Sequence, residues 1–445
     1  MVRPSLVLLA VLAMGCERLG GDVPKETAGA QSQLAAMEAP AIVVEPFEPV
    51  ATSRPVDAPL RVLVGGDLIP HRPSLAAPSA IAAALAPLAP VFGQADAVVA
   101  NFEAATGALD KKAFRLAYAA PPEWLDALPL SGISAISVAN NHACDLDYQG
   151  VEATLDAATK SGLVALGGDT NGDPWQPQTL VERDGKRVCA VAWTTLVNAP
   201  GGCARTVRLA VATENAAGRQ KIASAMQRAR LACDATVAII HGGVEYAPQT
   251  PQVMTMARQA ADAGADAVVI HHPHVPSPVV VHATKDGRNI PIFASVGNLV
   301  SNQGESWKLP MFPVLRENRR LVCVNGWTRL GLLADLAFDL QGDAPRLDWS
   351  FHLVWTENEH ADDRTVPVPK ITTRLLEPEK DSALLARLSQ DALGPVDLFD
   401  DPCWVERPLY TEGDRQQSPR CSTTLVRSAP RPGLVAASAR ARKKR

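Results

Sequence analysis

The chain has 445 residues, of which 47% are apolar and 20% are charged, so it is long enough to bury one large core. Its formal net charge is only −4, which argues against a protein that recognises nucleic acid by bulk charge. We expect no nucleic-acid partner, and other partners have to be inferred from local motifs.

The N-terminus has the pattern of an export signal. Arg3 precedes the short apolar run Leu6 to Ala13, and small residues stand just before Cys16. The run is too short to span a membrane, which takes about 20 apolar residues. Leu12 to Cys16 resembles a bacterial lipobox, so residues 1–16 are predicted to be a lipoprotein signal peptide with Cys16 lipidated; an ordinary cleaved signal is the alternative. We therefore expect a membrane-anchored lipoprotein of the cell envelope, on its periplasmic or extracellular face.

If Cys16 is lipidated, seven cysteines remain, and an odd number leaves at least one thiol unpaired. Export permits disulfides, and Cys403 with Cys421 could close a loop near the C-terminus. Spacing does not determine connectivity, and burial of the cysteines as small apolar residues is an equally good alternative. The sequence leaves the pairing open.

Residues 17–59 are rich in Ala, Pro, Glu and Gln without apolar periodicity, which predicts a disordered tether. The ordered part is expected to begin with a strand at Leu60 to Val64. Gly65 and Gly66 are expected to halt this strand and to place Asp67 at its C-terminal end.

Strands then alternate with Ala-rich helical stretches, a pattern that indicates α/β layers. The predicted strands are Ala95–Ala100, Ile133–Ala139, Arg187–Thr195, Thr236–Ile240, Ala267–Ile270 and Ile292–Val296, and the predicted helices are Gly150–Ser161, Thr213–Leu231 and Gln252–Ala263. Beyond Asn302, longer alternating segments predict antiparallel strands at Leu321–Val324, Thr328–Phe338 and Trp349–Trp355. They complete a domain of residues 60–370, followed by a helical extension at 371–410 with one amphipathic helix, Glu379–Leu393, and a disordered basic tail at 411–445.

Ionisable and amide side chains collect where the predicted strands end. The segments that carry them are Gly66–Arg72, Asn101–Glu103, Asn140–Asp145, His241–Tyr246 and His271–His274. Side chains at the carboxyl edges of several strands converge on one crevice in α/β folds. Carboxylate, imidazole and amide oxygen together suit Zn²⁺, Mn²⁺ or Fe²⁺ better than a structural Ca²⁺ cage. The segments therefore predict a site for a divalent transition metal.

Each segment also has a purely structural interpretation. Asp67 after two glycines can cap a turn, the pair Asn140–Asn141 can form one, and His241 can be a hydrogen-bonded core histidine. The run His272-Pro273-His274 is harder to explain in this way, because with His271 it places three imidazoles after one apolar strand. The occurrence of all these segments in one order favours the metal site.

The ordered motifs resemble those of one known family. They are Gly-Asp, Asn-x-Glu, Ala-Asn-Asn-His-x-x-Asp, His-Gly-x-x-Glu-Tyr, Gly-Ala-Asp followed by His-Pro-His, and Ser-x-Gly-Asn, over roughly residues 60–303. This set resembles the CapA, or poly-γ-glutamate capsule biosynthesis, family, which is similar in fold to the calcineurin-like metallophosphoesterases. The resemblance implies an α/β fold of the metallophosphoesterase-like, four-layer α/β/β/α sandwich type with a C-terminal extension. It also implies a site for two divalent ions, Mn, Zn or Fe.

The resemblance assigns roles to individual residues. The metal ligands are expected to be Asp67, His71, Glu103, Asn141, His241, His272 and His274, with His142 as the catalytic acid. The residues expected to support the ligands or contact substrate are Asn101, Asn140, Asp145, Glu245, Tyr246 and Asn298.

This sequence departs from the metallophosphoesterase pattern in its first motif. Ile69 stands two residues after Asp67, where those enzymes have histidine, so either His71 reaches the metal from a longer turn or this part of the site is weaker. The expected bridging ligand is Glu103 rather than an aspartate. His271 stands where the family commonly has glycine, and its ring either narrows the pocket or faces solvent.

The resemblance implies metal-dependent hydrolysis of a phosphoester, or of an acyl or amide bond, in the metabolism of an anionic surface polymer. The alternative is a non-catalytic factor that binds metal or polymer and assists capsule polymer assembly or export. The expected partners are the membrane, through the lipid anchor, and the polymer or phosphoester substrate.

Overall fold

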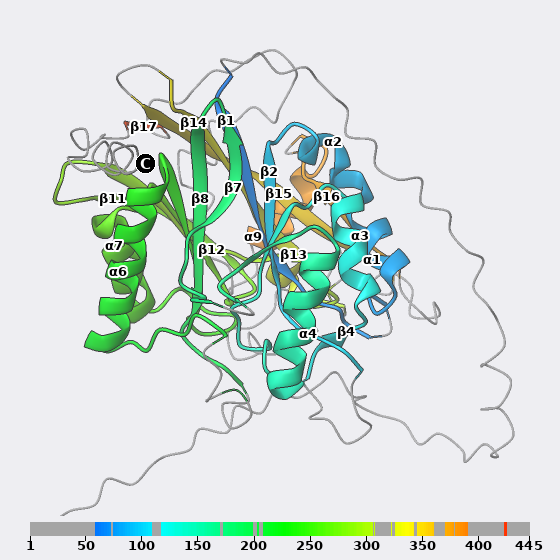
Figure 1. Ribbon diagram of the computed structural model, residues 1–445. Helices are drawn as coiled ribbons and strands as arrows, with labels where there is room; N and C mark the ends of the chain where they lie inside the picture. Colours follow the sequence, from blue (N-terminus) through cyan, green and yellow to red (C-terminus); the bar gives the residue numbers. More distant parts are fainter. Residues whose placement is uncertain are drawn as a thin grey trace, which may run out of the picture.

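Two β-sheets pack face to face at the centre of the molecule, and helices cover the outer face of each (Figure 1). The computed structural model describes residues 58–389, apart from 73, 109–116, 170–171, 199–202, 204–207, 306, 308–321, 323–324, 342–344, 360–369 and 378, together with 422–424. The predicted signal peptide with Cys16, the tether as far as residue 57, the Cys403–Cys421 pair and most of the C-terminal tail lie outside the described residues. In the part that is described, no helix is long and apolar enough to cross a membrane.

The larger sheet contains most of the N-terminal and C-terminal strands. Its order is β16 (Ile371–Leu375), β15 (Arg346–Asn358), β14 (Leu330–Asp339), β1 (Leu60–Leu68), β2 (Ala97–Phe102), β5 (Ala135–Ser137) and β6 (Val164–Leu166). β13 (Asn298–Val300) pairs with β1, and β17 (Ser422–Thr424) pairs with β15. The strands from β1 to β6 in this order run parallel, whereas β14, β15 and β16 are antiparallel. β14 and β15 confirm the predicted segments Thr328–Phe338 and Trp349–Trp355, while the predicted strand Leu321–Val324 lies, except for residue 322, outside the described residues.

The smaller sheet has the order β11 (Pro276–Ala283), β12 (Asn289–Val296), β10 (Ala267–His271), β9 (Ala235–His241), β8 (Lys186–Thr194) and β7 (Gln178–Arg183). Its four central strands are parallel, and β7 and β11 add antiparallel edges. A separate short pair joins β3 (Ala105–Thr106) to β4 (Ala119–Ala120).

Alternation along the strands explains the layers. In β1, Val62 and Val64 face the second sheet and pack in one core with Ile239 and Phe293, while Leu63 faces the helices. Helices α1 (Pro78–Leu85), α3 (Glu123–Leu130) and α4 (Asp147–Lys160) cover the larger sheet, beside the short η2 (Ala86–Leu88) and α2 (Ala89–Phe92). Helices α6 (Ala216–Ala232) and α7 (Pro251–Ala263) cover the smaller one, on the opposite side in Figure 1. The expected four-layer α/β/β/α sandwich is confirmed.

Two details of the predicted organisation are wrong. The glycine pair does not end β1, which continues to Leu68 after a register shift against β2. The large sheet also continues past residue 370, where we expected a helical extension to begin, because Ile371 and Thr373 are buried in β16 against β15. Only α9 (Ser382–Ser389) is helical in the described part of that extension; η4 (Gly326–Arg329) precedes β14.

Two disulfides give the pairing that the sequence leaves open. Cys144 pairs with Cys203, and Cys189 pairs with Cys233. The second bond joins β8 to the residue after α6, and the first ties the loop after β5 to the segment that follows β8. Disulfides are typical of exported proteins, so this pairing agrees with the predicted export signal.

A buried ion pair joins β1 to β14 inside the larger sheet. The Arg61 guanidinium donates to both oxygens of Asp335, from Nε at 2.8 Å and from Nη2 at 2.6 Å. His352 Nε2 lies 3.1 Å from the same carboxylate. Burial would raise the pKa of Asp335, but hydrogen bonds from Arg61 and His352 outweigh it and hold the pKa well below its usual range.

We expect Asp335→Asn to lower the free energy of unfolding by about 3 kcal/mol, because it removes the buried negative charge that accepts hydrogen bonds from both Nε and Nη2 of Arg61. The control is Glu182→Gln, which removes the partner of exposed Arg187 and should change stability by less than about 0.5 kcal/mol. Urea titration followed by circular dichroism gives both values. Equal effects of the two substitutions would contradict this assignment.

The same pair predicts a pH dependence. The pKa of Asp335 is lower in the folded protein than in the unfolded chain. Its stabilisation is therefore fully present above about pH 4 and is lost as the pH falls further. The difference in unfolding free energy between the unsubstituted chain and Asp335→Asn should therefore be constant between pH 7 and pH 5 and should narrow as the pH falls below about 4.

Candidate metal centre

Asp67 reaches the centre of the molecule because β1 passes very close to the turn after β12. A Cβ atom on Gly66 would lie 2.0 Å from the carbonyl oxygen of Gly297, so only glycine fits there. The Asp67 amide donates to that same carbonyl at 3.2 Å, and Asp67 pairs with Asn298 in the β1–β13 register. The glycine pair therefore lets β1 continue while it places Asp67 beside the ends of the second sheet.

Glu103 lies at the centre of a histidine cluster. Its carboxylate is fully buried, and neither oxygen has a hydrogen-bond partner among the residues that the structure describes. Oε1 lies 3.7 Å from His274 Nε2 and 3.9 Å from His241 Nε2. Glu103, His272 and His274 each offer one possible ligand atom, and these three atoms lie within 4.8 Å of one another. Ligand atoms that lie about 2.1 Å from one metal ion are about 3–3.5 Å from one another. The three side chains would therefore have to move only slightly closer together to bind an ion.

A hydrogen-bond network fixes the remaining candidate ligands around Glu103. Asp67 accepts from Asn101 Nδ2 at 2.8 Å, and its other oxygen lies 3.1 Å from His274 Nδ1. His241 Nε2 lies 2.8 Å from Asn141 Oδ1. These residues come from the ends of five different strands or the loops after them, as the sequence predicts. Asp67, Asn141 and His241 thus adjoin the Glu103 cluster.

Charge is unevenly distributed in the cluster. Burial, with the negative charges of Asp67, Glu245 and Asp145, raises the pKa of Glu103, although His274 acts against this. Burial alone would lower the pKa of His274, but Glu103 and Asp67 raise it to about 10. A proton on His274 is therefore the positive charge that compensates the carboxylates, and a divalent cation could take over that role.

The other two histidines of the cluster are neutral. Burial and the neighbouring His272 hold the pKa of His241 well below its usual range, and burial lowers the pKa of His272 to about 4. A neutral imidazole is the form that binds a metal ion. Within the described part of the chain, His272 Nδ1 is buried without a hydrogen-bond partner, so no neighbouring group competes with a ligand for this nitrogen.

Three residues of the site have strained backbones. Tyr246, His272 and His274 have φ values of 57°, 98° and 59°, in the region that favours glycine. Such conformations cost about 1–3 kcal/mol each and persist only where the surroundings fix them. Here they turn the His272 and His274 rings back towards Glu103 and direct Tyr246 over His274, with ring centroids 5.7 Å apart.

His142 forms a dyad with Asp145 at the edge of the cluster. His142 Nδ1 lies 2.6 Å from Asp145 Oδ2, and Asn198 Nδ2 donates to His142 Nε2 at 3.3 Å. The His142 amide donates to the side chain of Asn140, which itself donates to the carbonyl of Phe102 at 2.7 Å. Asn140 thus holds the loop that carries His142, and Asp145 orients the ring of His142.

Two histidines near the cluster are held by hydrogen bonds away from Glu103, and for His271 the alternative of a solvent-facing ring is wrong. His71 lies beside Tyr118, and both of its ring nitrogens have hydrogen-bond partners, so neither is free for a metal. Burial, with His274 and His142, lowers the pKa of His71 to about 3. His271 is buried and does not face solvent, because its Nε2 donates to the carbonyl of Gly65 at 2.8 Å and ties β10 to β1.

The expected supporting residues lie around the cluster. Asn298 Oδ1 lies 3.0 Å from His274 Nδ1, and Asn298 Nδ2 donates to Gln303 at 2.9 Å. Gln303 in turn donates to the Tyr246 hydroxyl at 3.3 Å. Glu245 is half-buried and near enough to raise the pKa of Glu103.

Sequence reasoning missed Tyr118, Asn198 and Gln303. Asn198 follows β8 by four residues, so the rule of polar residues after strands could have found it. Tyr118 has no such signal, because it precedes a two-residue strand far from the motifs. Its ring lies 4.3 Å from that of His142, and burial with the charge of Glu103 raises its pKa.

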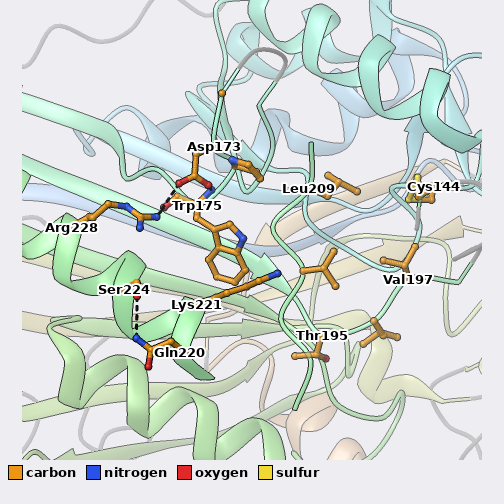
Figure 2. Close-up of a pocket in the computed structure, with 15 residues that line it drawn as sticks. Cys144, Asp173, Trp175, Thr195, Val197, Leu209, Gln220, Lys221, Ser224 and Arg228 are labelled. Carbon is orange, nitrogen blue, oxygen red and sulfur yellow. Dashed lines mark hydrogen bonds and ion pairs between the residues drawn. A yellow bond between two sulfur atoms is a disulfide. The ribbon is translucent and has the colours of Figure 1, made fainter. Parts of the chain in front are cut away.

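A pocket of about 800 Å³ opens beside the cluster, between α6 and the loops after β6 and β8 (Figure 2). Cys144, two residues after His142, and Val197, next to Asn198, form its near end. Trp175 and Lys221 project into it, while Arg228 is ion-paired with Asp173 at its wall. Its lining includes chain neighbours of His142 and Asn198 but no residue of the Glu103 cluster, so the pocket is distinct from the candidate metal centre.

Comparison with known proteins identifies the family. Residues 61–303 match the model of the family described as bacterial capsule synthesis protein PGA_cap. The chain is 28% identical over 232 residues to the capsule biosynthesis protein CapA of Bacillus anthracis, covering 49% of this chain and 53% of that protein. It is 29% identical over 223 residues to the PGA biosynthesis protein CapA of Bacillus subtilis (strain 168), covering 48% and 56%. The chain spans about half the length of these curated relatives. With more than half of its own residues matched by the family model, the chain belongs to the bacterial capsule synthesis protein family PGA_cap.

Proposed function

We propose that this protein is a metal-dependent hydrolase of the cell envelope that acts on a phosphoester, or on an acyl or amide bond, in the metabolism of an anionic surface polymer. The observation that carries the proposal is the Glu103 carboxylate, buried without a hydrogen-bond donor and faced by His241, His272 and His274. Burying an unpaired carboxylate costs several kcal/mol. A bound cation removes that cost.

Glu103, His272 and His274 would hold a divalent ion, and Asp67, Asn141 and His241 adjoin them where a second ion could share Glu103. This mixture of imidazole, carboxylate and amide oxygen suits Mn²⁺, Zn²⁺ or Fe²⁺. When bound, such ions act as Lewis acids towards the attacked phosphoryl or carbonyl group.

His142 is the proposed proton donor to the leaving oxygen. Asp145 accepts from Nδ1–H, which leaves Nε2 as the nitrogen that exchanges a proton. To act as the donor, Nε2 must first take up a proton in place of its hydrogen bond from Asn198.

The names of the two relatives support a role in capsule biosynthesis. With the predicted lipobox at Cys16, they favour a lipoprotein anchored to the membrane and a polymer as partner. The second candidate is a non-catalytic factor that binds metal or polymer and assists polymer assembly or export. One observation favours it, because His71 is engaged elsewhere and the site has one ligand fewer than the resemblance implies.

If the protein is such a hydrolase, the purified chain should contain about two transition-metal ions and should hydrolyse bis-p-nitrophenyl phosphate. The double variant His272→Ala, His274→Ala should lose both, because it removes two ligands beside Glu103. The control is His282→Ala on the edge strand β11, where the ring binds Asp262, and it should keep both. Elemental analysis and a colorimetric assay give the result. Bound metal without turnover would favour the assembly factor, and no metal would contradict the centre.

His142→Gln should lower kcat by about 10²–10⁴-fold, the usual contribution of a general acid, and leave the metal content unchanged. Asp145→Asn should lower kcat less, because the ring remains without its orienting charge. Steady-state kinetics and elemental analysis of the same samples test this. Loss of metal in His142→Gln, or full activity, would contradict the assigned role.

A further inference from the structure

The hydrogen bonds of His71 determine which of its ring nitrogens carries the hydrogen. The backbone amide of Asn302 donates to His71 Nδ1 at 3.0 Å. A ring nitrogen that accepts a hydrogen bond carries no hydrogen, so in neutral His71 the hydrogen is on Nε2. Because Asn302 supplies a backbone donor, this tautomer does not depend on any side chain.

The Nε2 hydrogen of His71 has one partner, the Tyr118 hydroxyl, at 3.3 Å. Nε2–H therefore donates and the hydroxyl oxygen accepts. A phenol keeps its own hydrogen at neutral pH, because its ordinary pKa is about 10. In the described part of the chain, the hydroxyl has no second hydrogen-bond partner. The Tyr118 O–H is thus left to donate to a group that is not part of the protein.

Tyr118 is held firmly beside the proposed proton donor. Its amide donates to Asp145 Oδ2 at 2.6 Å, the same oxygen that contacts His142 Nδ1. Its ring lies 4.3 Å from the His142 ring and meets the His71 ring edge-on at 5.0 Å. Tyr118 and His71 are only partly buried, whereas Glu103 is fully buried, so they stand at the entrance of the cluster.

We propose that Tyr118 donates a hydrogen bond to the oxyanion of the attacked phosphoryl or acyl group, and that His71 is its positioning residue rather than a metal ligand. This inference rests on the proposed function. It also gives a role to the histidine of the first motif, which lies four residues after Asp67 and not two residues after it as in the metallophosphoesterases. The ring at position 71 meets Asn302 and Tyr118, and not Glu103.

Metal binding tests the role of His71. His71→Gln should bind Mn²⁺ with an affinity within about threefold of the unsubstituted chain, as should the control His282→Gln. His272→Ala, which removes a ligand atom, should bind at least about tenfold more weakly. Isothermal titration of the full chain with Mn²⁺ measures all four proteins. A loss in His71→Gln equal to that in His272→Ala would make His71 a ligand and overturn the inference.

Binding of inorganic phosphate, a stable tetrahedral oxyanion, tests the role of Tyr118 without turnover. In the Mn²⁺-loaded chain, Tyr118→Phe should weaken phosphate binding about tenfold, the usual effect of one lost hydrogen bond to a charged group. The matched control Tyr148→Phe, on exposed α4, should bind as the unsubstituted chain does. His71→Gln should also weaken phosphate binding. The double variant His71→Gln, Tyr118→Phe should bind phosphate more tightly than the sum of the two single effects implies, because the two residues act as one unit.

The outcomes separate this inference from the proposed function. Unchanged phosphate affinity in Tyr118→Phe overturns the donor role even if the chain is an active hydrolase. Phosphate binding that depends on Tyr118 in a chain without turnover supports the donor role and contradicts the hydrolase. A chain that binds Mn²⁺ but no phosphate contradicts the donor role. In an active chain, Tyr118→Phe should also lower kcat by about 10²-fold without loss of metal.

Discussion

A buried carboxylate without a hydrogen-bond donor is the constraint around which the site is arranged. Removing a charge from water is costly unless a partner replaces the lost hydration, and Glu103 has no donor among the described residues. The neighbouring histidines differ in their affinity for a proton. His274 takes up a proton, with its pKa raised to about 10, while His241 and His272 stay neutral. This combination is suited to exchange of a proton for a metal cation.

The fold delivers these groups because parallel strands from two sheets end at the same edge. Asp67 and Glu103 come from the larger sheet, and His241 and His272 from the smaller one. The close approach of Gly66 to Gly297 lets the first strand reach the second sheet. The strands that carry these groups are packed between buried apolar cores, which fix where the strands end. The ligand positions are thus a property of the whole sandwich.

Most of the layer arrangement and of the cluster could be predicted from sequence, because polar residues after apolar strands are a local pattern. Glu103, Asn141 and His272 were predicted in this way. The direction in which a side chain points is not local. His71 looks like a ligand in the sequence, yet the amide of Asn302, 231 residues away, binds its Nδ1. Tyr118 carries no motif, and β16 is too short and too polar for the pattern to separate it from a linker.

The most direct test of the metal centre is a crystal structure of the chain grown with Mn²⁺, with diffraction measured for the anomalous signal of manganese. A metal centre at Glu103 should give an anomalous peak within coordination distance of the Glu103 carboxylate and of the His272 and His274 rings. The His71 ring should keep its bond to the Asn302 amide. A map without a peak at Glu103, or with manganese bound elsewhere in the molecule, would contradict the account.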